Sequence, residues 1–258
     1  NGEMKLDVEK LKYSYTWFDA ESAAAESKRT KKQFIDRTPF IKKEEVQIYP
    51  DTTVWIKDFM YSYNEPMHND YFSHPAYQDY PVVGVSWNQA VAFCNWRTNF
   101  KNGYQRSKGK HTVSRFRLPN EGEWEYAARG GEDYKYAGSN DLNEVGWYDC
   151  NSGSKTHGVG QKKSNGYGLY DMSGNVWEWC SDYYEPSFYE KQKSKTLCIN
   201  PTGPTRKVDN HSPLRVLRGG SFLCNDSYCS GYRVSRRTGN SEDTSSNHIG
   251  FRCVMDIR

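Results

Sequence analysis

Long apolar runs are absent from this chain of 258 residues. No hydrophobic stretch approaches the roughly 20 residues that a membrane-spanning helix needs, so we expect no membrane span. No signal peptide is recognisable, and because the chain does not open with methionine, its natural start could have been removed. Internal repeats and low-complexity segments are also lacking, which excludes a repeat architecture.

A strong excess of one charge is missing as well. The sequence has 35 Lys and Arg against 32 Asp and Glu, a formal charge of +3, and no basic block interleaved with aromatic residues, so we expect no nucleic-acid partner. Abundant instead are 20 tyrosines, 8 tryptophans, 21 glycines and 10 prolines. This composition predicts a loop-rich globular protein, long enough to bury a core that leans on aromatic side chains.

Seven cysteines are more than a cytosolic domain of this length usually carries. They favour an oxidising, extracytoplasmic compartment. Because seven is an odd number, at least one thiol stays unpaired or pairs outside the chain.

Two helices are predicted from capping residues and apolar periodicity. In VSWNQAVAFCNWR, Ser86 is a suitable N-cap, and apolar residues recur at helical spacing up to Cys94, which therefore points inward. In RLPNEGEWEYAARGG, Asn120 caps the helix, Glu123 completes a capping box and Gly130 ends the helix.

The remaining sequence gives weaker patterns. Residues 7–36 are charged, contain alanine and lack proline and glycine, which predicts a surface helix. Residues 38–80 are expected to be irregular, with one strand at Thr53–Ile56, and short strands and turns are expected beyond Gly131. The fold class that fits is α+β, with two helices on a small, twisted, mainly antiparallel sheet in a single domain of residues 1–258.

Cys224 and Cys229 lie five positions apart in RGGSFLCNDSYCSGYR, and three interpretations remain open. A structural disulfide would close only a short loop, so its stabilisation would be small. A zinc site needs two further ligands, and only His248 lies near. The third is a redox pair or a site for a soft metal such as Cu(I), because nearby arginines would favour thiolates. Those arginines are Arg218, Arg233, Arg236 and Arg237.

The segment LYDMSGNVWEW places two carboxylates, Asp171 and Glu178, around a Ser-Gly-Asn turn. With the backbone carbonyl groups of Gly174 and Val176, they are the hard oxygen ligands that Ca²⁺ prefers. The same spacing is compatible with a capped turn whose tryptophans lie in the core, so these residues alone leave a calcium site open.

Four motifs together resemble the formylglycine-generating enzyme family, also called sulfatase-modifying factors. They are RGGSFLCNDSYCSGYR, RLPNEGEWEYAARGG, NGYGLYDMSGNVWEW and the terminal IGFRC. The resemblance runs from about Tyr80 to Cys253, and its specific part is the Gly-Gly-Ser segment with two cysteines.

This resemblance implies a C-type-lectin-like fold with little regular secondary structure. It also implies an oxidase that uses O₂ to convert a cysteine of unfolded sulfatases to formylglycine. Cys224 and Cys229 would bind Cu(I) as a bis-thiolate that accepts the substrate thiol, and Ser221 and Tyr228 would line the site. A redox centre is needed because breaking an unactivated C–H bond is beyond side-chain acid–base catalysis. The LYDMSGNVWEW segment would hold structural calcium.

The same resemblance implies a disulfide between Cys94 and Cys253. The cysteines of the family's second disulfide are replaced here by Ala128 and Val234. The remaining cysteines have no role that the resemblance assigns, and small buried side chains are the simplest interpretation. They are Cys150, Cys180 and Cys198.

One expected active-site position differs from the family. His248 stands where the animal enzymes have an asparagine, with Asn247 one place earlier. Histidine is bulkier and can titrate, which affects how substrate or oxygen is handled. We expect His248 and Arg233 to contact the substrate peptide.

The first part of the chain, residues 1–79, departs further and lacks the family's opening strand motif. Residues 47–87 resemble gliding-motility and type IX secretion lipoproteins of the GldK and GldJ kind, which share the fold, look structural and generally lack the cysteine pair. We therefore expect a copper-dependent oxidase that acts on cysteine-containing peptides in the bacterial periplasm or envelope. The alternatives are a non-catalytic envelope scaffold, with envelope protein partners and a lipid anchor, and a lectin-like binding module.

Overall fold

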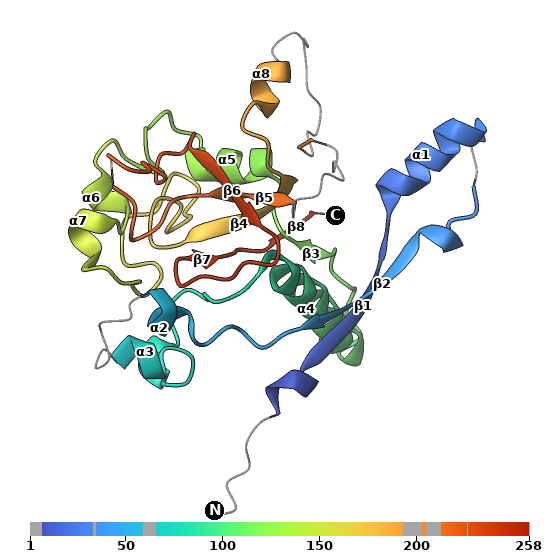
Figure 1. Ribbon diagram of the computed structural model, residues 1–258, viewed down its shortest axis with the longest axis horizontal. Coiled ribbons are helices and arrows are strands. Elements are labelled where there is room, and N and C mark those ends of the chain that lie inside the picture. The colour runs from blue at the N-terminus through green and yellow to red at the C-terminus, as the bar shows by residue number, and fades with distance from the viewer. Residues whose placement is uncertain are drawn as a thin grey trace, which may run out of the picture.

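The computed structural model describes residues 7–32, 35–58, 66–192, 203–204, 213–225 and 227–257. Its body surrounds a four-stranded sheet with the strand order β6-β5-β4-β7. An arm built from the N-terminal segments extends away from this body (Figure 1).

The central sheet is mainly antiparallel, as predicted. It consists of β4 (Trp177–Tyr183), β5 (Leu214–Arg218), β6 (Arg237–Ser241) and β7 (Ile249–Gly250). β5 pairs antiparallel with both β4 and β6, whereas β7 runs parallel to β4. A second small sheet joins β3 (Phe116–Arg117) to β8 (Val254–Met255) in antiparallel pairing. The α+β class is confirmed.

Both predicted helices start at the predicted caps. α4 (Trp87–Ser107) begins after a capping box between Ser86 and Gln89, and α5 (Glu121–Arg129) begins after one between Asn120 and Glu123. Such boxes satisfy backbone N–H groups that have no partner inside the helix. Gly130 ends α5 at φ +62°, a conformation that glycine adopts without strain.

The largest apolar cluster lies where α4 meets β4. Ala90 and Cys94 of α4 are buried there with Trp177 and Trp179, so the inward orientation of Cys94 is confirmed. The indole N–H of Trp179 donates to the carbonyl group of Val85 at 3.2 Å. This bond lets a large ring fill the core without leaving its donor unsatisfied.

The other helices of the described chain have three to five residues, except α1, which has 11. They are η1 (Val8–Lys10), η2 (Thr38–Phe40), η3 (Pro75–Tyr77), α2 (Val54–Asp58), α3 (Pro66–Asp70), α6 (Leu142–Val145), α7 (Asp149–Ser152), α8 (Phe188–Gln192) and the arm helix α1 (Ala20–Thr30). Among the residues described, no helix is both long and apolar enough to cross a bilayer.

The N-terminal arm corrects the prediction of a helix over residues 7–36. Strand β1 (Lys12–Phe18) occupies the first half and pairs antiparallel with β2 (Ile41–Gln47), and only the tip of the arm carries α1 (Figure 1). The sequence KYSYTWF alternates aromatic and polar residues, which is a strand pattern. The charged, alanine-containing composition predicted the helix correctly only for the second half of the segment, where α1 lies.

The expected strand at Thr53–Ile56 is also wrong, because α2 occupies this position. A carboxylate oxygen of Asp51 accepts the backbone N–H of Thr53 at 2.9 Å and so starts the turn. Val54 and Trp55 are both only 2% exposed. Capping and burial here override the β-propensity of a short apolar run.

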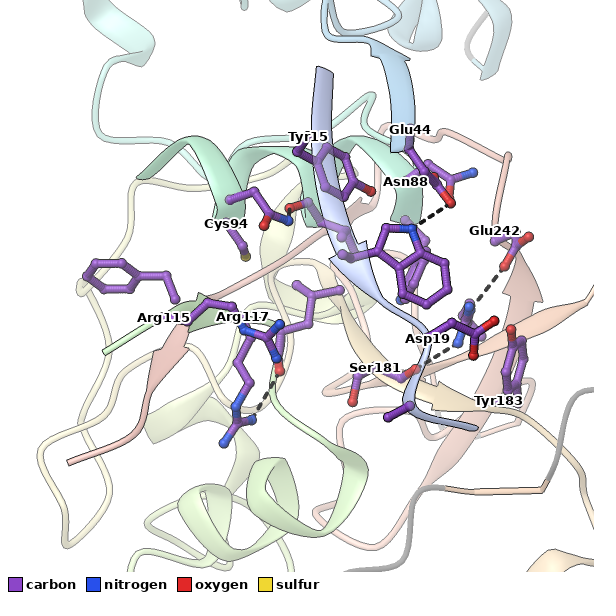
Figure 2. A pocket seen from close by; sticks show the side chains of 18 of the residues that line it. Tyr15, Asp19, Glu44, Asn88, Cys94, Arg115, Arg117, Ser181, Tyr183 and Glu242 are labelled. Atoms are coloured by element: carbon purple, nitrogen blue, oxygen red, sulfur yellow. Dashed lines mark hydrogen bonds and ion pairs between the residues drawn. The ribbon is translucent and has the colours of Figure 1, made fainter. Parts of the chain in front are cut away.

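A cavity of about 490 Å³ lies where β1 passes over the body (Figure 2). The Arg215 guanidinium lies between the rings of Trp87 and Tyr183, 3.6 Å from each centroid. It also pairs with Glu242 at 3.1 Å. The Arg215 charge on this cavity wall is therefore satisfied within the protein.

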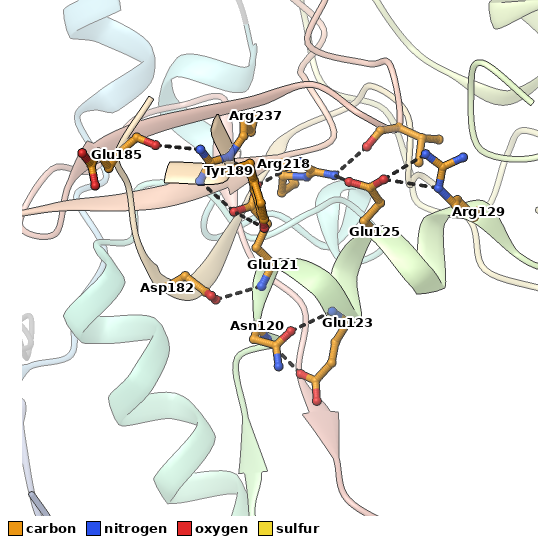
Figure 3. A network of polar contacts seen from close by, with 11 residues as sticks. Asn120, Glu121, Glu123, Glu125, Arg129, Asp182, Glu185, Tyr189, Arg218 and Arg237 are labelled. Carbon is orange, nitrogen blue, oxygen red and sulfur yellow. Dashed lines mark hydrogen bonds and ion pairs between the residues drawn. The ribbon is translucent and has the colours of Figure 1, made fainter. Parts of the chain in front are cut away.

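A buried ion-pair network joins α5 to the sheet (Figure 3). Glu121 accepts hydrogen bonds from Arg218 at 3.0 Å and from Arg237 at 2.7 and 2.8 Å. Arg218 is 1% exposed and Glu121 is 3% exposed. Because a buried charge is tolerated only when it is paired, these contacts fix α5 against β5 and β6.

Asp182 is a buried carboxyl group beside this network and accepts the backbone N–H of Glu121 at 2.8 Å. Burial, with the nearby charge of Glu121, raises the pKa of Asp182 to about 6. A carboxyl group whose pKa rises on folding binds its proton more tightly in the native state than in the unfolded state. Its contribution to stability is therefore present at low pH and is lost as pH rises through about 6.

We expect Asp182→Asn, a neutral mimic, to be more stable than the wild type at pH 8 by up to about 3 kcal/mol. The advantage should shrink as pH falls through 6 toward 4, where the wild-type group is protonated. Urea unfolding at several pH values measures the difference. The exposed Asp133→Asn serves as the control, with a pH-independent difference. A variant less stable than the wild type at pH 8 would contradict the prediction.

Candidate functional site

The cysteine segment forms the connection between β5 and β6. Its path requires a close approach of two backbone segments at Gly220, where φ is +72° and a Cβ atom would collide with the backbone nitrogen of Tyr232. Only glycine fits both the conformation and the contact. The two ends of the loop therefore pack directly on each other.

Phe222 anchors the loop to the LYDMSGNVWEW segment. Its ring is fully buried and stacks on Trp55, with ring centroids 5.9 Å apart. Its backbone N–H donates to the carbonyl group of Asn175 at 2.9 Å. Two motifs that lie far apart in the sequence are thus in contact.

Cys224 and Cys229 are joined by a disulfide, with their Cα atoms 5.6 Å apart. Of the three interpretations, the disulfide is the state present in the structure. The same contact brings both sulfur atoms together within one short loop. A thiolate pair forms from this state by a two-electron reduction.

Hydrogen bonds around Asn225 and Ser221 shape this loop. The side chain of Asn225 accepts the backbone N–H of Tyr228 at 2.8 Å, and its carbonyl group accepts that of Cys229 at 3.1 Å. The backbone N–H of Ser221 lies 3.4 Å from the sulfur of Cys224, and its hydroxyl group lies 3.8 Å from that sulfur. These donors can stabilise negative charge on a thiolate.

The two cysteines differ in exposure. Cys224 is 2% exposed and lies in the apolar cluster with Tyr136 and Tyr232, whereas Cys229 is only partly buried. Tyr228, next to Cys229, is 87% exposed. A reagent in solution therefore reaches the pair from the side of Cys229.

His248 lies directly before β7. Its carbonyl group accepts the backbone N–H of Trp177 at 2.8 Å, and its Nδ1 lies 2.9 Å from the hydroxyl group of Ser246. Arg233 is half-buried, and its backbone N–H donates to Ser230 at 3.2 Å. Contact of His248 and Arg233 with a substrate stays a prediction.

Three of the four candidate calcium ligands, Asp171, Val176 and Glu178, line a cavity of about 420 Å³. Burial raises the pKa of Asp171, and its Oδ1 is buried without a hydrogen-bond partner. Glu178 accepts hydrogen bonds from Arg252 at 2.6 Å and from Trp124 at 2.6 Å. Each carboxylate oxygen has two lone pairs, so Glu178 retains acceptor capacity.

Side chains alone do not complete this site. Within the described ranges, no group of three or more His, Cys, Asp or Glu residues could hold a metal ion. Carbonyl groups would have to supply the remaining ligands, which is the role expected for Gly174 and Val176. The unsatisfied oxygen of Asp171 fits a hard cation.

Cys94 and Cys253 lie together but are not bonded. Their sulfur atoms are 3.4 Å apart, and both cysteines are free thiols in the structure. The implied disulfide is thus corrected to a thiol pair in contact. The hydrogen bond from Cys94 lowers the pKa of Cys253, and the charge of Arg97 acts in the same direction.

The other cysteine predictions have mixed outcomes. Cys180 is buried, as expected, but Cys150 is exposed, and Cys198 lies outside the described residues. Ala128 and Val234, which replace the family's second disulfide, are buried in one apolar cluster. Apolar packing therefore stands where the family has its second disulfide.

These features can be compared with known proteins. The sequence profile of the Sulfatase-modifying factor enzyme 1-like domain matches residues 2–257. The chain belongs to this family. Treponema denticola variable protein 1, a solved structure, has a TM-score of 0.56 at 30% identity and covers 70% of this chain and 73% of its own. This likeness confirms the fold class.

Curated relatives match the larger part of the chain. A formylglycine-generating enzyme of Streptomyces coelicolor is 40% identical over 193 residues, which is 69% of this chain and 53% of that protein. A Bos taurus relative named inactive C-alpha-formylglycine-generating enzyme 2 is 33% identical over 191 residues, or 68% and 50%. The chain spans about half the length of these relatives.

Sequence reasoning missed the charged residues that hold the cysteine loop. Arg218 was expected only to influence the thiols, and its partner Glu121 was not singled out. One signal could have found them: Arg218 ends the apolar strand LRVLR, and an arginine buried in a sheet needs a carboxylate partner.

We expect mild oxidation to join Cys94 to Cys253, because the Cys253 pKa is lowered and the thiolate is the reactive form. The bond would link residues 159 positions apart and raise the free energy of unfolding by about 5 kcal/mol. Thiol counting by mass spectrometry and urea unfolding measure both effects. Cys253→Ser should show neither, and the exposed Cys150→Ser should retain both. Oxidation without a gain in stability would contradict this.

Proposed function

We propose that this protein is a copper-dependent oxidase that converts a peptide cysteine to formylglycine with O₂. Its substrates would be unfolded sulfatases or other cysteine-containing peptides outside the cytoplasm. The observation that carries the proposal is the convergence of Cys224 and Cys229 in one loop, with Cys229 open to the surface. Relatives named formylglycine-generating enzyme support the reaction class. The disulfide supports an oxidising compartment.

The donor atoms of the pair suit Cu(I). Two thiolates are the soft ligands that Cu(I) prefers, and these two sulfur atoms already reach each other. The disulfide form offers no thiolate, so two electrons and two protons must first convert it to two thiols. Bound copper would supply the dioxygen chemistry that side chains lack.

The protein's own residues would hold the pair and receive the peptide. Ser221 places two donors near the sulfur of Cys224, and the turn around Asn225 positions Cys229. An extended peptide would approach along Tyr228, with His248 and Arg233 as further contacts, and main-chain hydrogen bonds would supply affinity. The buried Cys224 side of the pair excludes water.

We expect the reduced, Cu(I)-loaded protein to convert a peptide containing Cys-x-Pro-x-Arg to an aldehyde in the presence of O₂. Cys229→Ser should abolish the product, because one thiolate cannot hold the metal as the pair does. Cys150→Ser, which also removes a thiol, should keep the activity. Mass spectrometry of the peptide detects the aldehyde.

The same assay tests the alternative of an envelope scaffold. A folded wild-type protein that is loaded with copper and yields no aldehyde would contradict the oxidase proposal and favour the scaffold. Equal product from the wild type and Cys229→Ser would place the chemistry elsewhere.

We also propose that Asp171 and Glu178, with the carbonyl groups of Gly174 and Val176, hold structural calcium. At a calcium concentration of about 100 times Kd the native state gains about 2.7 kcal/mol, which raises Tm by roughly 5–10 °C. Asp171→Asn should lose this shift, whereas the exposed Asp133→Asn should keep it. Identical melting in calcium and in chelator would contradict the proposal.

A further inference from the structure

An apolar groove of about 670 Å³ runs between α4 and the N-terminal part of the chain. α4 and β1 lie side by side (Figure 1). The apolar walls include Ile48, Val82, Phe93, Trp96 and Phe251. The groove shares no lining residue with the cysteine loop, whereas Val82, Phe251 and Arg252 also line the cavity beside the candidate calcium ligands.

Exposed aromatic rings on α4 extend one wall of the groove. Phe93, Trp96 and Phe100 are 38%, 44% and 66% exposed. Their rings contact one another in sequence, with centroids 5.5 Å and 5.2 Å apart, and Phe93 also meets Phe251 at 5.4 Å. Exposed aromatic groups in mutual contact mark a binding surface rather than scattered surface residues.

Most polar side chains in the groove already have partners within the protein. The Gln89 amide donates to the carbonyl groups of residues 47 and 49 at 2.9 and 2.8 Å. The Tyr13 hydroxyl group accepts from Asn99 at 2.9 Å, and Arg252 pairs with Glu178 at 2.6 Å. A peptide backbone or a sugar in the groove would therefore bury polar groups without partners. The occupant must be largely hydrocarbon.

One cation in the groove differs from these groups. Arg97 lies over the ring of Phe116, 4.7 Å from its centroid, and no carboxylate pairs with it among the residues that the structure describes. Residues 80–120, which include α4, contain seven Lys and Arg and no Asp or Glu, and of the two arginines that line the groove only Arg252 pairs with a carboxylate of the described chain, that of Glu178. The polar end of the occupant is therefore anionic.

We propose that the groove binds a single-chain anionic amphiphile, such as a long-chain carboxylate. Its hydrocarbon chain would lie against Phe93, Trp96 and Phe251, and its anionic group would pair with Arg97. A terminal negative charge matches an apolar groove that has at its edge one exposed arginine, Arg97, with contacts to Phe116 and Cys253 but no carboxylate partner among the described residues. The site does not depend on Cys224 and Cys229, neither of which lines the groove.

The test titrates the protein with laurate and with dodecanol, both below aggregation, and follows binding by calorimetry. We expect saturable 1:1 binding, with laurate about fivefold tighter because of one partly exposed ion pair. Arg97→Ala should remove this preference and keep dodecanol binding. Val82→Asp, at a 44% exposed position of the groove, should weaken laurate by more than tenfold. Tyr126→Asp, 68% exposed and outside the groove, should change nothing.

Three outcomes would overturn the proposal. One is the absence of saturable laurate binding to the folded wild type. Another is unchanged binding in Val82→Asp, which would move the site elsewhere. The third is retention by phosphatidylglycerol vesicles without binding of laurate, which would make the face a membrane surface. None of these results depends on copper or aldehyde formation, so failure here is separate from failure of the proposed oxidase.

Discussion

The buried carboxylate of Glu121 is the constraint on which the cysteine loop depends. Arg218 ends β5 and Arg237 begins β6, and the two residues are directly opposite in the sheet register. Two like charges in such a position repel each other. Glu121 accepts hydrogen bonds from both guanidinium groups. Its negative charge offsets their repulsion and holds the ends of β5 and β6 together. The connection that carries both cysteines is thereby held at its two ends by one side chain of α5.

Backbone contacts fix the path of the cysteine loop between these two ends. Gly220 packs on Tyr232 near the closing end, and Phe222 binds the Asn175 carbonyl group in the neighbouring motif. Asn225 then folds the residues between the cysteines into a tight turn. Each contact removes freedom from the chain before any ligand arrives, so a site built on this loop would be pre-organised.

The features that depend on neighbouring residues, such as helix starts and short motifs, could be predicted from the sequence. An N-cap at Ser86 and a capping box at Asn120 located α4 and α5, and the motifs located the cysteine pair. The strand at Lys12–Phe18 was missed because the prediction rested on the charged residues of the whole segment and not on the alternation of aromatic and polar residues within it. The strand LRVLR indicates that Arg218 needs a carboxylate partner, but the identity of that partner could not be predicted, since Glu121 lies 97 residues away. The groove is assembled from five separate segments, and only the folded chain brings them together.

The two cysteine pairs differ in how far solvent can reach them. Cys94 is buried and its partner is half-buried behind α4, whereas Cys229 faces the surface beside Tyr228. Thiol–disulfide exchange requires in-line access of a thiolate to a sulfur atom, so a soluble reductant reaches the loop pair far more readily than the helix pair. Burial thus separates a pair of free thiols from a disulfide that a reductant can open. The fold can keep a protected thiol pair and a reducible disulfide in one molecule because it places them at different depths.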